Sequence, residues 1–240
     1  MALITGAAKR VGAAIAQQLH ADGYQIAIHH HTSIDEAYQL KEDLNKKRPN
    51  SAFIIKQDLA EKNAANKLIK MVVNKTGQIN LLVNNASIFL DTPLQQSKSV
   101  ENLWDLLHTI NARIPYFLSL EAIPFLRESQ GSIVNITDIH SEKPRKNYSA
   151  YCASKAALVA VSNSLALDLA PDIRVNCVAP GAIIWASTEN RTVQDEAIES
   201  TPLARVGNPF DIAQAVSYLA KAEYVTGHVL NVDGGRTLNT

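Results

Sequence analysis

Short apolar runs alternate with longer amphipathic stretches along almost the whole chain, and this alternation constrains the fold more than any other feature. Each run has the length of a β-strand, whereas the longer stretches carry apolar residues at the three- and four-residue spacing of helices. We predict strands at Ala2–Thr5, Gln25–His29, Ala52–Ile55, Ile79–Val83, Ser132–Ile136, Ile173–Val178 and His228–Val232. We predict helices at Val11–Ala21, Ile34–Lys47, Lys62–Lys75, Tyr148–Leu169 and Pro209–Lys221, and a long stretch from Val100 to Leu126 that Pro115 and Pro124 kink or divide.

A strand-helix alternation of this kind predicts an α/β fold, with a doubly wound, parallel, seven-stranded sheet and helices on both faces (Rossmann-type). The central runs are apolar almost throughout, as expected of strands that are buried on both faces. We see no linker or repeat, and we therefore expect one domain over residues 1–240. Residues 182–208 have little apolar periodicity and follow a strand's carboxyl end, which is where we expect a substrate lid.

Composition limits the possible partners. Lys+Arg and Asp+Glu both number 23, so the net charge is zero, which argues against a nucleic-acid or anionic-membrane binder. The cysteines Cys152 and Cys177 form neither a metal-ligand pattern nor a disulfide framework. We see no signal peptide, and no apolar run reaches the roughly 18 residues that span a bilayer. We therefore expect a cytoplasmic protein.

The turn after the first strand has the residues of a phosphate-binding loop. Gly6 and Gly12 let the backbone turn tightly and approach a phosphate, and the helix that starts near Val11 presents free N–H groups and a positive dipole end. Arg10 adds a cation at the same place. The position between a strand and a helix favours a dinucleotide site. The alternative is an ordinary strand-helix turn.

The end of the second predicted strand indicates which dinucleotide binds. An acidic residue there would hold an NAD ribose and repel a 2′-phosphate. This chain instead reads His29–Ser33 (HHHTS), and its first acid is Asp35. The donors of His30, Thr32 and Ser33 suit a 2′-phosphate, so we expect NADPH/NADP+ as the cofactor. We expect no metal here, because adjacent strand residues point to opposite faces and do not converge on one ion.

Tyr151 and Lys155 form a candidate proton-donating pair. They lie four residues apart on a predicted helix and so share one face. A nearby ammonium stabilises a phenolate, so we expect Lys155 to lower the pKa of Tyr151 and make it a better proton donor. Taken alone, this spacing also fits a solvated helix face. Asp138 precedes the tyrosine by thirteen residues.

These pieces together resemble the short-chain dehydrogenase/reductase family. The matching segments run in the family's order: Thr5-Gly6…Gly12, Asp58-Leu59, Asn84-Asn85-Ala86, Asn111, Asp138…Tyr151…Lys155, Pro180-Gly181 and Val232-Asp233-Gly234-Gly235.

The resemblance assigns roles to several of these residues. It implies that Asp58 and Leu59 lie near the adenine and that Pro180-Gly181 borders the nicotinamide. It also implies that Asn85 and Ala86 line the cofactor pocket. Asn111 is then expected to support a water or proton path to Lys155, and the family implies a homotetramer.

Asp138 departs from the family, most of which carries serine at that place. The chain is similar here to the pteridine reductases, bacterial members included, which carry aspartate. The segments that carry this likeness are Thr5–Arg10, His29–His31, Asn84–Phe89 and Ala179–Trp185. Two residues differ from the eukaryotic pteridine reductases: Thr32 stands where they carry arginine, and Ile183 where they tend to carry serine.

The resemblance implies NADPH-dependent reduction of a C=N bond in a 7,8-dihydropterin, with dihydrofolate as a further candidate. Tyr151 would give the proton, assisted by Lys155, and Asp138 would hold a proton and replenish the phenol. The expected substrate contacts are Arg10, Ser87, Phe89, Asp138, Tyr151 and Trp185. Ser87 can alternatively bind a cofactor phosphate. Phe89 as a core residue, Asp138 as a turn cap and Trp185 as a lid anchor are the open alternatives.

Two other functions compete with this one. A carbonyl reductase of the same family, such as a 3-oxoacyl-thioester reductase, is the nearest. Asp138 argues against it, because a carboxylate repels a ketone oxygen that becomes negative. A non-catalytic NADP-sensing regulator on the same fold is the other, although such proteins usually lose the tyrosine or lysine and this chain keeps both.

Overall fold

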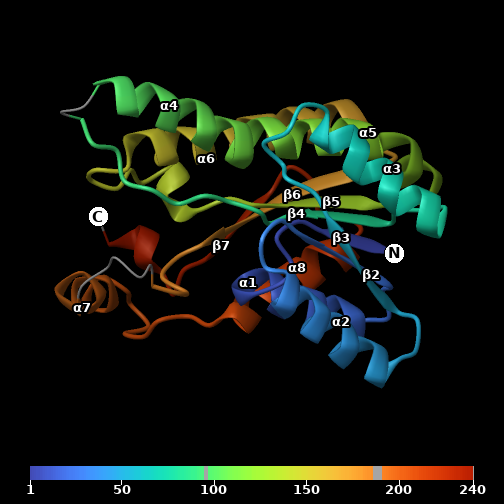
Figure 1. The fold of residues 1–240 in the computed structure, drawn as a ribbon. Helices are drawn as coiled ribbons and strands as arrows, with labels where there is room; N and C mark the ends of the chain where they lie inside the picture. The colour runs from blue at the N-terminus through green and yellow to red at the C-terminus, as the bar shows by residue number, and fades with distance from the viewer. Residues whose placement is uncertain (95–96, 186–190, 240) are drawn as a thin grey trace.

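The computed structural model describes residues 1–94, 97–185 and 191–239, and in this part of the chain a parallel sheet of seven strands forms the middle layer (Figure 1). The strand order is β3-β2-β1-β4-β5-β6-β7, which is the doubly wound arrangement that the sequence predicts. The strands are β1 (Ala2–Ile4), β2 (Ile26–His30), β3 (Ala52–Lys56), β4 (Leu81–Asn84), β5 (Ser132–Ile136), β6 (Arg174–Pro180) and β7 (Val229–Val232).

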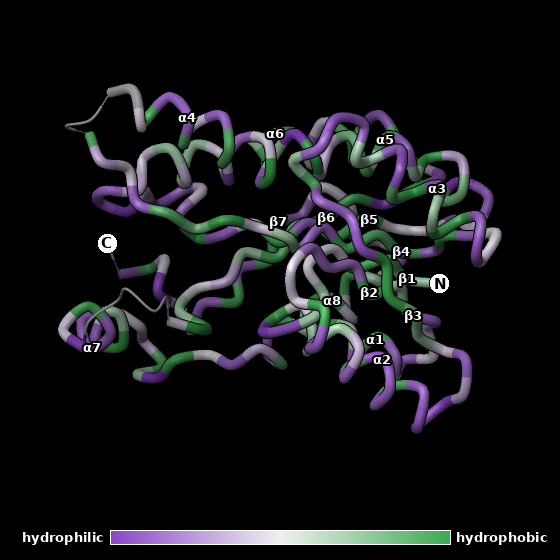
Figure 2. The backbone as a smooth tube through the Cα atoms, viewed as in Figure 1, coloured by the Kyte–Doolittle hydropathy of each residue, from purple (hydrophilic) through white to green (hydrophobic). Residues whose placement is uncertain are grey.

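Helices cover both faces of the sheet. On one face lie α1 (Arg10–Ala21), α2 (Ile34–Lys47) and α8 (Pro209–Lys221). On the other face lie α3 (Ala64–Thr76), α4 (Ser97–His108), α5 (Ile114–Glu128) and α6 (Ser149–Leu169). Buried apolar residues of the helices pack against the sheet in both layers, and Figure 2 shows hydrophobic and hydrophilic residues alternating along the helices. A short helix, α7 (Arg191–Glu199), lies within the segment that we expected to be a lid, and residues 186–190 of that segment lie outside the described residues.

Alternation along the strands divides the core into two layers. Ala2 and Ile4 of β1 pack toward α1 and α8, whereas Leu3 between them packs toward α3 and α5. Successive strand residues point to opposite faces, so a strand that is buried on both sides needs apolar residues at every position. The parallel register aligns Leu3 with Ala27 and Leu82, and it brings the carboxyl ends of the central strands to one edge.

The long helical stretch is divided at a place that the sequence analysis did not predict. A π-helical turn, Thr109–Arg113, separates α4 from α5. Pro115 directly follows this wide turn, in the first turn of α5, and α5 continues through Pro124. Asn111 lies within the π-helical turn.

By length and composition alone, α6 could cross a membrane, because its 21 residues include a window of mean hydropathy 1.2. This differs from our reading of the sequence, which found no apolar run of that length. Half of the window is buried inside the molecule, where α6 packs beside β6 and α4. Its apolar character is therefore that of a core helix of this fold.

Candidate active site

Two glycines and an asparagine form a close-packed turn after β1. A Cβ atom at Gly12 would lie 2.3 Å from the carbonyl oxygen of Gly6 and 2.7 Å from Nδ2 of Asn85, so only glycine fits there. Nδ2 of Asn85 donates hydrogen bonds to the carbonyl oxygens of Thr5 (2.9 Å) and Gly6 (3.1 Å). The turn is thereby tied to the segment after β4.

The first turn of α1 has the features of an anion site. Its N-cap residue, Lys9, makes no side-chain capping hydrogen bond, and no acidic residue lies in the first turn. Arg10 is exposed and adopts a φ of 56°, in the left-handed region that L-residues rarely occupy. Free N–H groups, a positive dipole end and two cations fit a pyrophosphate at this position.

Among the three histidines at the end of β2, it is His29 that contacts this turn. Its Nδ1 accepts a hydrogen bond from the Gly6 N–H at 3.0 Å, so the proton sits on Nε2, which donates to the carbonyl oxygen of Gln57 at 2.9 Å. Burial lowers the pKa of His29 from 6.5 to about 4, so the ring is neutral at pH 7. His29 was absent from the expected cofactor contacts, because the sequence does not show which of three adjacent histidines faces the turn.

The other residues near the end of β2 that the sequence predicts to contact the cofactor differ in how exposed they are. His30 is buried, and its Nδ1 has no hydrogen-bond partner among the residues that the structure describes, whereas Thr32 is exposed and Ser33 precedes α2. Leu59 is a buried core residue.

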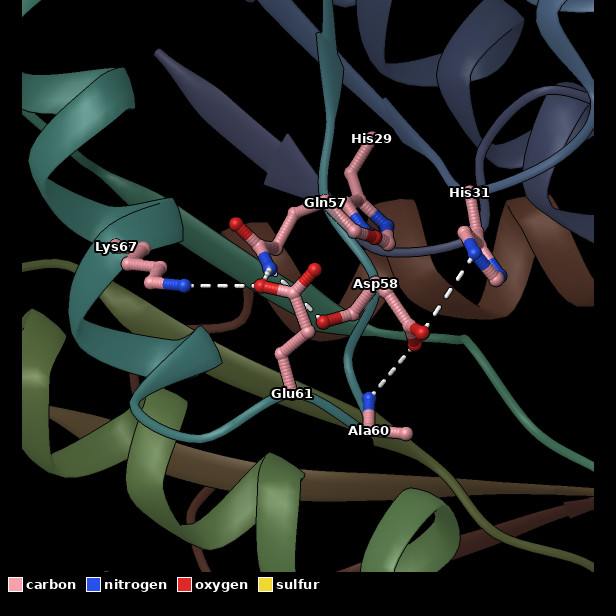
Figure 3. Close-up of polar contacts among 7 residues, drawn as sticks. All are labelled: His29, His31, Gln57, Asp58, Ala60, Glu61 and Lys67. Atoms are coloured by element: carbon pink, nitrogen blue, oxygen red, sulfur yellow. Dashed lines mark hydrogen bonds and ion pairs between the residues drawn. The ribbon is translucent and has the colours of Figure 1, made fainter.

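Asp58 lies just after β3, between His31 and Ala60, as Figure 3 shows. One of its carboxylate oxygens is 3.7 Å from Nε2 of His31, and the other accepts a hydrogen bond from the Ala60 N–H at 2.9 Å. The Asp58 carboxylate is therefore held beside the segment that follows β2, and its place near an adenine stays a prediction.

A cavity of about 430 Å³ runs along the carboxyl ends of the central strands. Most of the residues predicted to contact the cofactor line it: Gly6, Arg10, Val11, Asn85, Ala86, Ser87, Tyr151, Lys155, Pro180 and Gly181. His30, Thr32, Ser33, Asp58 and Leu59 are not among its lining residues. The cavity thus joins the turn after β1 to the Tyr151 helix.

Tyr151 and Asp138 are in direct contact. The phenolic O–H donates to Oδ2 of Asp138 at 2.6 Å, and Oδ1 of the same carboxylate accepts from the His140 N–H at 2.8 Å. Asp138 also caps the 3₁₀ turn Ile139–Ser141. The two roles that the sequence left as alternatives, turn cap and partner of the tyrosine, are therefore both present in one side chain.

The pKa of Tyr151 differs from the sequence prediction. Burial raises it well above its usual value of 10, and Asp138 raises it further through its charge and its hydrogen bond. The expected lowering by Lys155 was wrong, because the Lys155 ammonium donates to the carbonyl oxygen of Ile136 at 2.8 Å and lies 5.9 Å from the Tyr151 ring centroid. Burial lowers the pKa of Lys155 to about 8. Tyr151 is therefore firmly protonated at pH 7.

The side chain of Asn111 is hydrogen-bonded to the segment after β4. Its Oδ1 accepts hydrogen bonds from the Ile88 N–H (2.9 Å) and the Ser87 hydroxyl (3.1 Å). Its Nδ2 donates to the Ile88 carbonyl (2.9 Å) and to the hydroxyl of Ser154 (3.0 Å). The side chain predicted to support a proton path thus anchors the residues next to Phe89.

A second cavity, of about 420 Å³, continues outward from Tyr151. All six predicted substrate contacts line it: Arg10, Ser87, Phe89, Asp138, Tyr151 and Trp185. The Phe89 ring stacks on Tyr148 with centroids 4.5 Å apart and meets Tyr151 edge-on at 4.7 Å. Phe89 therefore contributes to a small apolar cluster and to the cavity wall at once. Arg145 and Arg236, which the sequence analysis did not identify, also line this cavity.

Comparison with known proteins gives the family. A family model described as "Enoyl-(Acyl carrier protein) reductase" matches residues 6–237. The chain belongs to the short-chain dehydrogenase/reductase family. It is therefore an oxidoreductase that uses a nicotinamide dinucleotide, NAD(H) or NADP(H), and the turn after β1, with its uncapped helix start and glycine cradle, fits that cofactor.

Relatives within the short-chain dehydrogenase/reductase family carry two kinds of name. A "3-oxoacyl-[acyl-carrier-protein] reductase FabG" from Staphylococcus epidermidis is 35% identical over 98% of this chain and 97% of that protein. "Pteridine reductase 1" from Leishmania tarentolae is 34% identical over 99% of this chain and 96% of that protein. A "putative ketoacyl reductase 2" of granaticin synthesis from Streptomyces violaceoruber is 31% identical over 99% of this chain and 96% of that protein. Overall similarity to the first two is therefore nearly equal.

Proposed function

We propose that the protein is an NADPH-dependent pteridine reductase that reduces the C=N bond of a 7,8-dihydropterin, with dihydrofolate as a further substrate. The observation that carries this proposal is the 2.6 Å hydrogen bond from the Tyr151 hydroxyl to Asp138. A hydrogen-bonded phenol and carboxylate can move protons in sequence, which an imine requires as its nitrogen becomes an amine.

The roles of the chain's own residues follow from their positions. NADPH supplies the hydride that adds to the ring carbon. Tyr151 donates its phenolic proton to the ring nitrogen, and the Asp138 carboxylate, which accepts the hydrogen bond of the phenol, relays a proton from solvent back to the phenolate. Lys155 places a positive charge beside this pair while the Ile136 carbonyl holds its ammonium in place. Phe89 offers a flat apolar wall on which a pterin ring can stack.

The charge on Asp138 favours an imine over a ketone. Reduction of a ketone develops a negative oxygen, and at about 4 Å from a carboxylate the repulsion is about 4 kcal/mol at an effective dielectric constant of 20. An imine nitrogen is more basic than a ketone oxygen, so it can take its proton before the hydride arrives, and the negative charge that Asp138 would repel then does not develop.

The end of β2 favours NADPH over NADH. From His29 to Ile34 it carries donors and no carboxylate that would oppose a 2′-phosphate, and the first acid is Asp35 in α2. Asp58, across the rim, faces His31.

Oxidation of NADPH in the presence of 7,8-dihydrobiopterin tests the proposal. We expect turnover, followed as loss of nicotinamide absorbance, and a decrease of about 100-fold or more in Asp138→Ala. An NADPH complex that forms but turns over neither dihydrobiopterin nor dihydrofolate would exclude the proposed function.

A 3-oxoacyl-thioester reductase is the second candidate. The name of the Staphylococcus epidermidis relative and its slightly higher identity, 35% against 34% for the pteridine reductase, favour it. Acetoacetyl thioesters distinguish the two. If carbonyl reduction is the native activity, wild type turns over these thioesters faster than dihydrobiopterin. If the pterin proposal holds, Asp138→Ser, which removes the carboxylate, raises thioester reduction and lowers dihydropterin reduction.

We further propose a cytoplasmic homotetramer. The outer helices expose large apolar side chains: Trp104 of α4 is 45% exposed, Phe117 of α5 39% and Leu167 of α6 82%. Such residues on one helical layer suit a subunit interface. Light scattering of the purified protein measures the assembly, and a monomer at micromolar concentration would contradict it.

A further inference from the structure

The hydroxyl of Ser154 joins the Tyr151 helix to the π-helical turn. It donates to the carbonyl oxygen of Tyr151, one turn earlier in α6, at 2.7 Å, and it accepts from Nδ2 of Asn111 at 3.0 Å. Ser154 is fully buried. A serine hydroxyl has a single proton, so the bond to the Tyr151 carbonyl leaves it only lone pairs to offer to the amide. The serine therefore links the backbone of the proton donor to Asn111 with a defined donor and acceptor at each step.

The Asn111 amide uses all of its hydrogen-bonding capacity. Its Oδ1 accepts from the Ile88 N–H and from the Ser87 hydroxyl. Its Nδ2 donates to the Ile88 carbonyl and to Ser154. An amide offers two N–H groups and two lone pairs, so these four bonds satisfy it completely while it is buried. Removal of the Ser154 hydroxyl would leave one buried N–H of Asn111 without a partner, and the amide would shift to find another.

The position of Asn111 bears on the aromatic wall of the outer cavity. The amide holds both backbone groups of Ile88, and Phe89 is the next residue. The Phe89 ring meets the Tyr151 ring edge-on at 4.7 Å, and the Tyr151 hydroxyl donates to Asp138 at 2.6 Å. Tyr151 is thus held at its hydroxyl by Asp138. At its carbonyl it is connected through Ser154 and Asn111 to the segment that carries Phe89.

We propose that Ser154 is a positioning residue for the reaction at Tyr151, and that its hydroxyl fixes the spacing between the phenol and residues 87–89. The inference rests on the proposed function for the kind of ring that binds beside Phe89. Ser154 is not among the lining residues of the cofactor cavity or the outer cavity, so it acts through Asn111 and the Tyr151 backbone. A proton donor must lie within hydrogen-bond reach of the atom that it protonates, and a small displacement slows the transfer.

Two substitutions at Ser154 test this role through turnover. Ser154→Ala removes the hydroxyl, whereas Ser154→Cys keeps a weaker donor and acceptor at the same position. With dihydrobiopterin and saturating NADPH, we expect kcat to fall about 30-fold in Ser154→Ala and about 3-fold in Ser154→Cys, because a displaced donor transfers its proton more slowly. The Kd for NADPH should stay within about 2-fold of wild type, since no cofactor contact is removed. A wild-type kcat in the cysteine variant would overturn the inference even if the alanine variant does not fold.

Ser162 of the same helix provides a matched control. It is also buried, donates to the Leu158 carbonyl at 2.6 Å and accepts from Nδ2 of Asn135 at 2.8 Å. Its amide partner lies in β5 and lines neither cavity. Ser162→Ala should therefore lower the urea midpoint about as much as Ser154→Ala does, yet leave kcat within about 2-fold of wild type. Equal losses of kcat in the two alanine variants would overturn the inference, because a general loosening of α6 would then explain both.

A double-mutant cycle tests the link to Asn111 without any turnover. The free energy of unfolding is measured in urea for Ser154→Ala, for Asn111→Ala and for the double variant. We expect the two losses not to add, so that the double variant is about as stable as the less stable single variant, because either substitution already breaks the shared hydrogen bond. Losses that add fully would show that the two side chains act independently, and would overturn the inference.

The outcomes separate this inference from the proposed function. If the protein reduces acetoacetyl-CoA and no pterin, the proposed function fails, and the Ser154 and Ser162 variants are measured with the thioester. A decrease of about 30-fold in Ser154→Ala, with Ser162→Ala near wild type, would then support the positioning role on that substrate. If Ser154→Ala and Ser154→Cys reduce dihydrobiopterin as fast as wild type, the proposed function stands and the positioning role fails.

Discussion

The glycine turn after β1 and the outer cavity are built in different ways, although Arg10 and Tyr151 line both the cavity beside the turn and the outer one. The turn is made of backbone atoms and buried side chains, with Gly6 held between His29 and Asn85. The cavity wall consists of half-exposed side chains from distant segments, such as Phe89, Arg145 and Arg236. We therefore expect substitutions in the turn to change cofactor affinity and the stability of the fold. Substitutions in the cavity should instead change kcat and the choice of substrate.

The largest expected effect comes from Tyr151→Phe, which removes one oxygen from the boundary of the two regions. We expect kcat for dihydropterin reduction to fall about 1,000-fold, because the proton donor is lost. The Kd for NADPH, measured by fluorescence titration, should change less than 3-fold. Substantial remaining turnover would show that another group, Asp138 first, donates the proton.

Gly12→Ala tests the contribution of the turn after β1. The added Cβ atom would lie 2.3 Å from the Gly6 carbonyl oxygen, so we expect a loss of about 1–3 kcal/mol in stability. The Kd for NADPH should rise at least about 10-fold, while kcat at saturating NADPH stays near wild type. Gly77→Asn is the control, because a Cβ at Gly77 has no atom within 4 Å and asparagine tolerates its φ of 71°. Equal cofactor affinity in Gly12→Ala and wild type would contradict the role of the cradle.

The smallest effect at pH 7 is expected from His29→Gln, since an amide can accept from Gly6 and donate to Gln57 as the imidazole does. The difference in the free energy of unfolding between this variant and wild type should appear at acidic pH. An unfolded histidine binds a proton near pH 6.5, whereas the folded His29 stays neutral down to about pH 4. The unfolded state therefore gains the extra proton first, and the free energy of unfolding falls as pH decreases through this window.

This one group accounts for a decrease of about 3 kcal/mol between pH 7 and pH 4. Urea unfolding at several pH values should show that the variant lacks this part of the decrease. If the free energy of unfolding has the same pH dependence in wild type and variant, His29 takes up its proton at the same pH in the folded and unfolded states.

The alternation of apolar runs determined most of the fold by itself. The helices Ile34–Lys47 and Pro209–Lys221 and the strand Ser132–Ile136 have the predicted bounds, because burial on one or both faces demands a regular apolar spacing. The spacing of Tyr151 and Lys155 likewise predicted a shared helix face, and both residues line the cofactor cavity. Local periodicity is sufficient for such features, since every residue involved lies within one element.

Only the tertiary structure decided which distant groups meet. The strand order β4-β5-β6-β7 brings the segments that follow β5 and β7 close together, and Arg145 and Arg236 therefore line one cavity although they are 91 positions apart in the sequence (236 − 145 = 91). It also decided that His29 rather than His30 contacts Gly6, and that burial and Asp138 raise the pKa of Tyr151. The physical reason is that desolvation and charge depend on neighbours in space, whereas the sequence alone specifies neighbours along the chain.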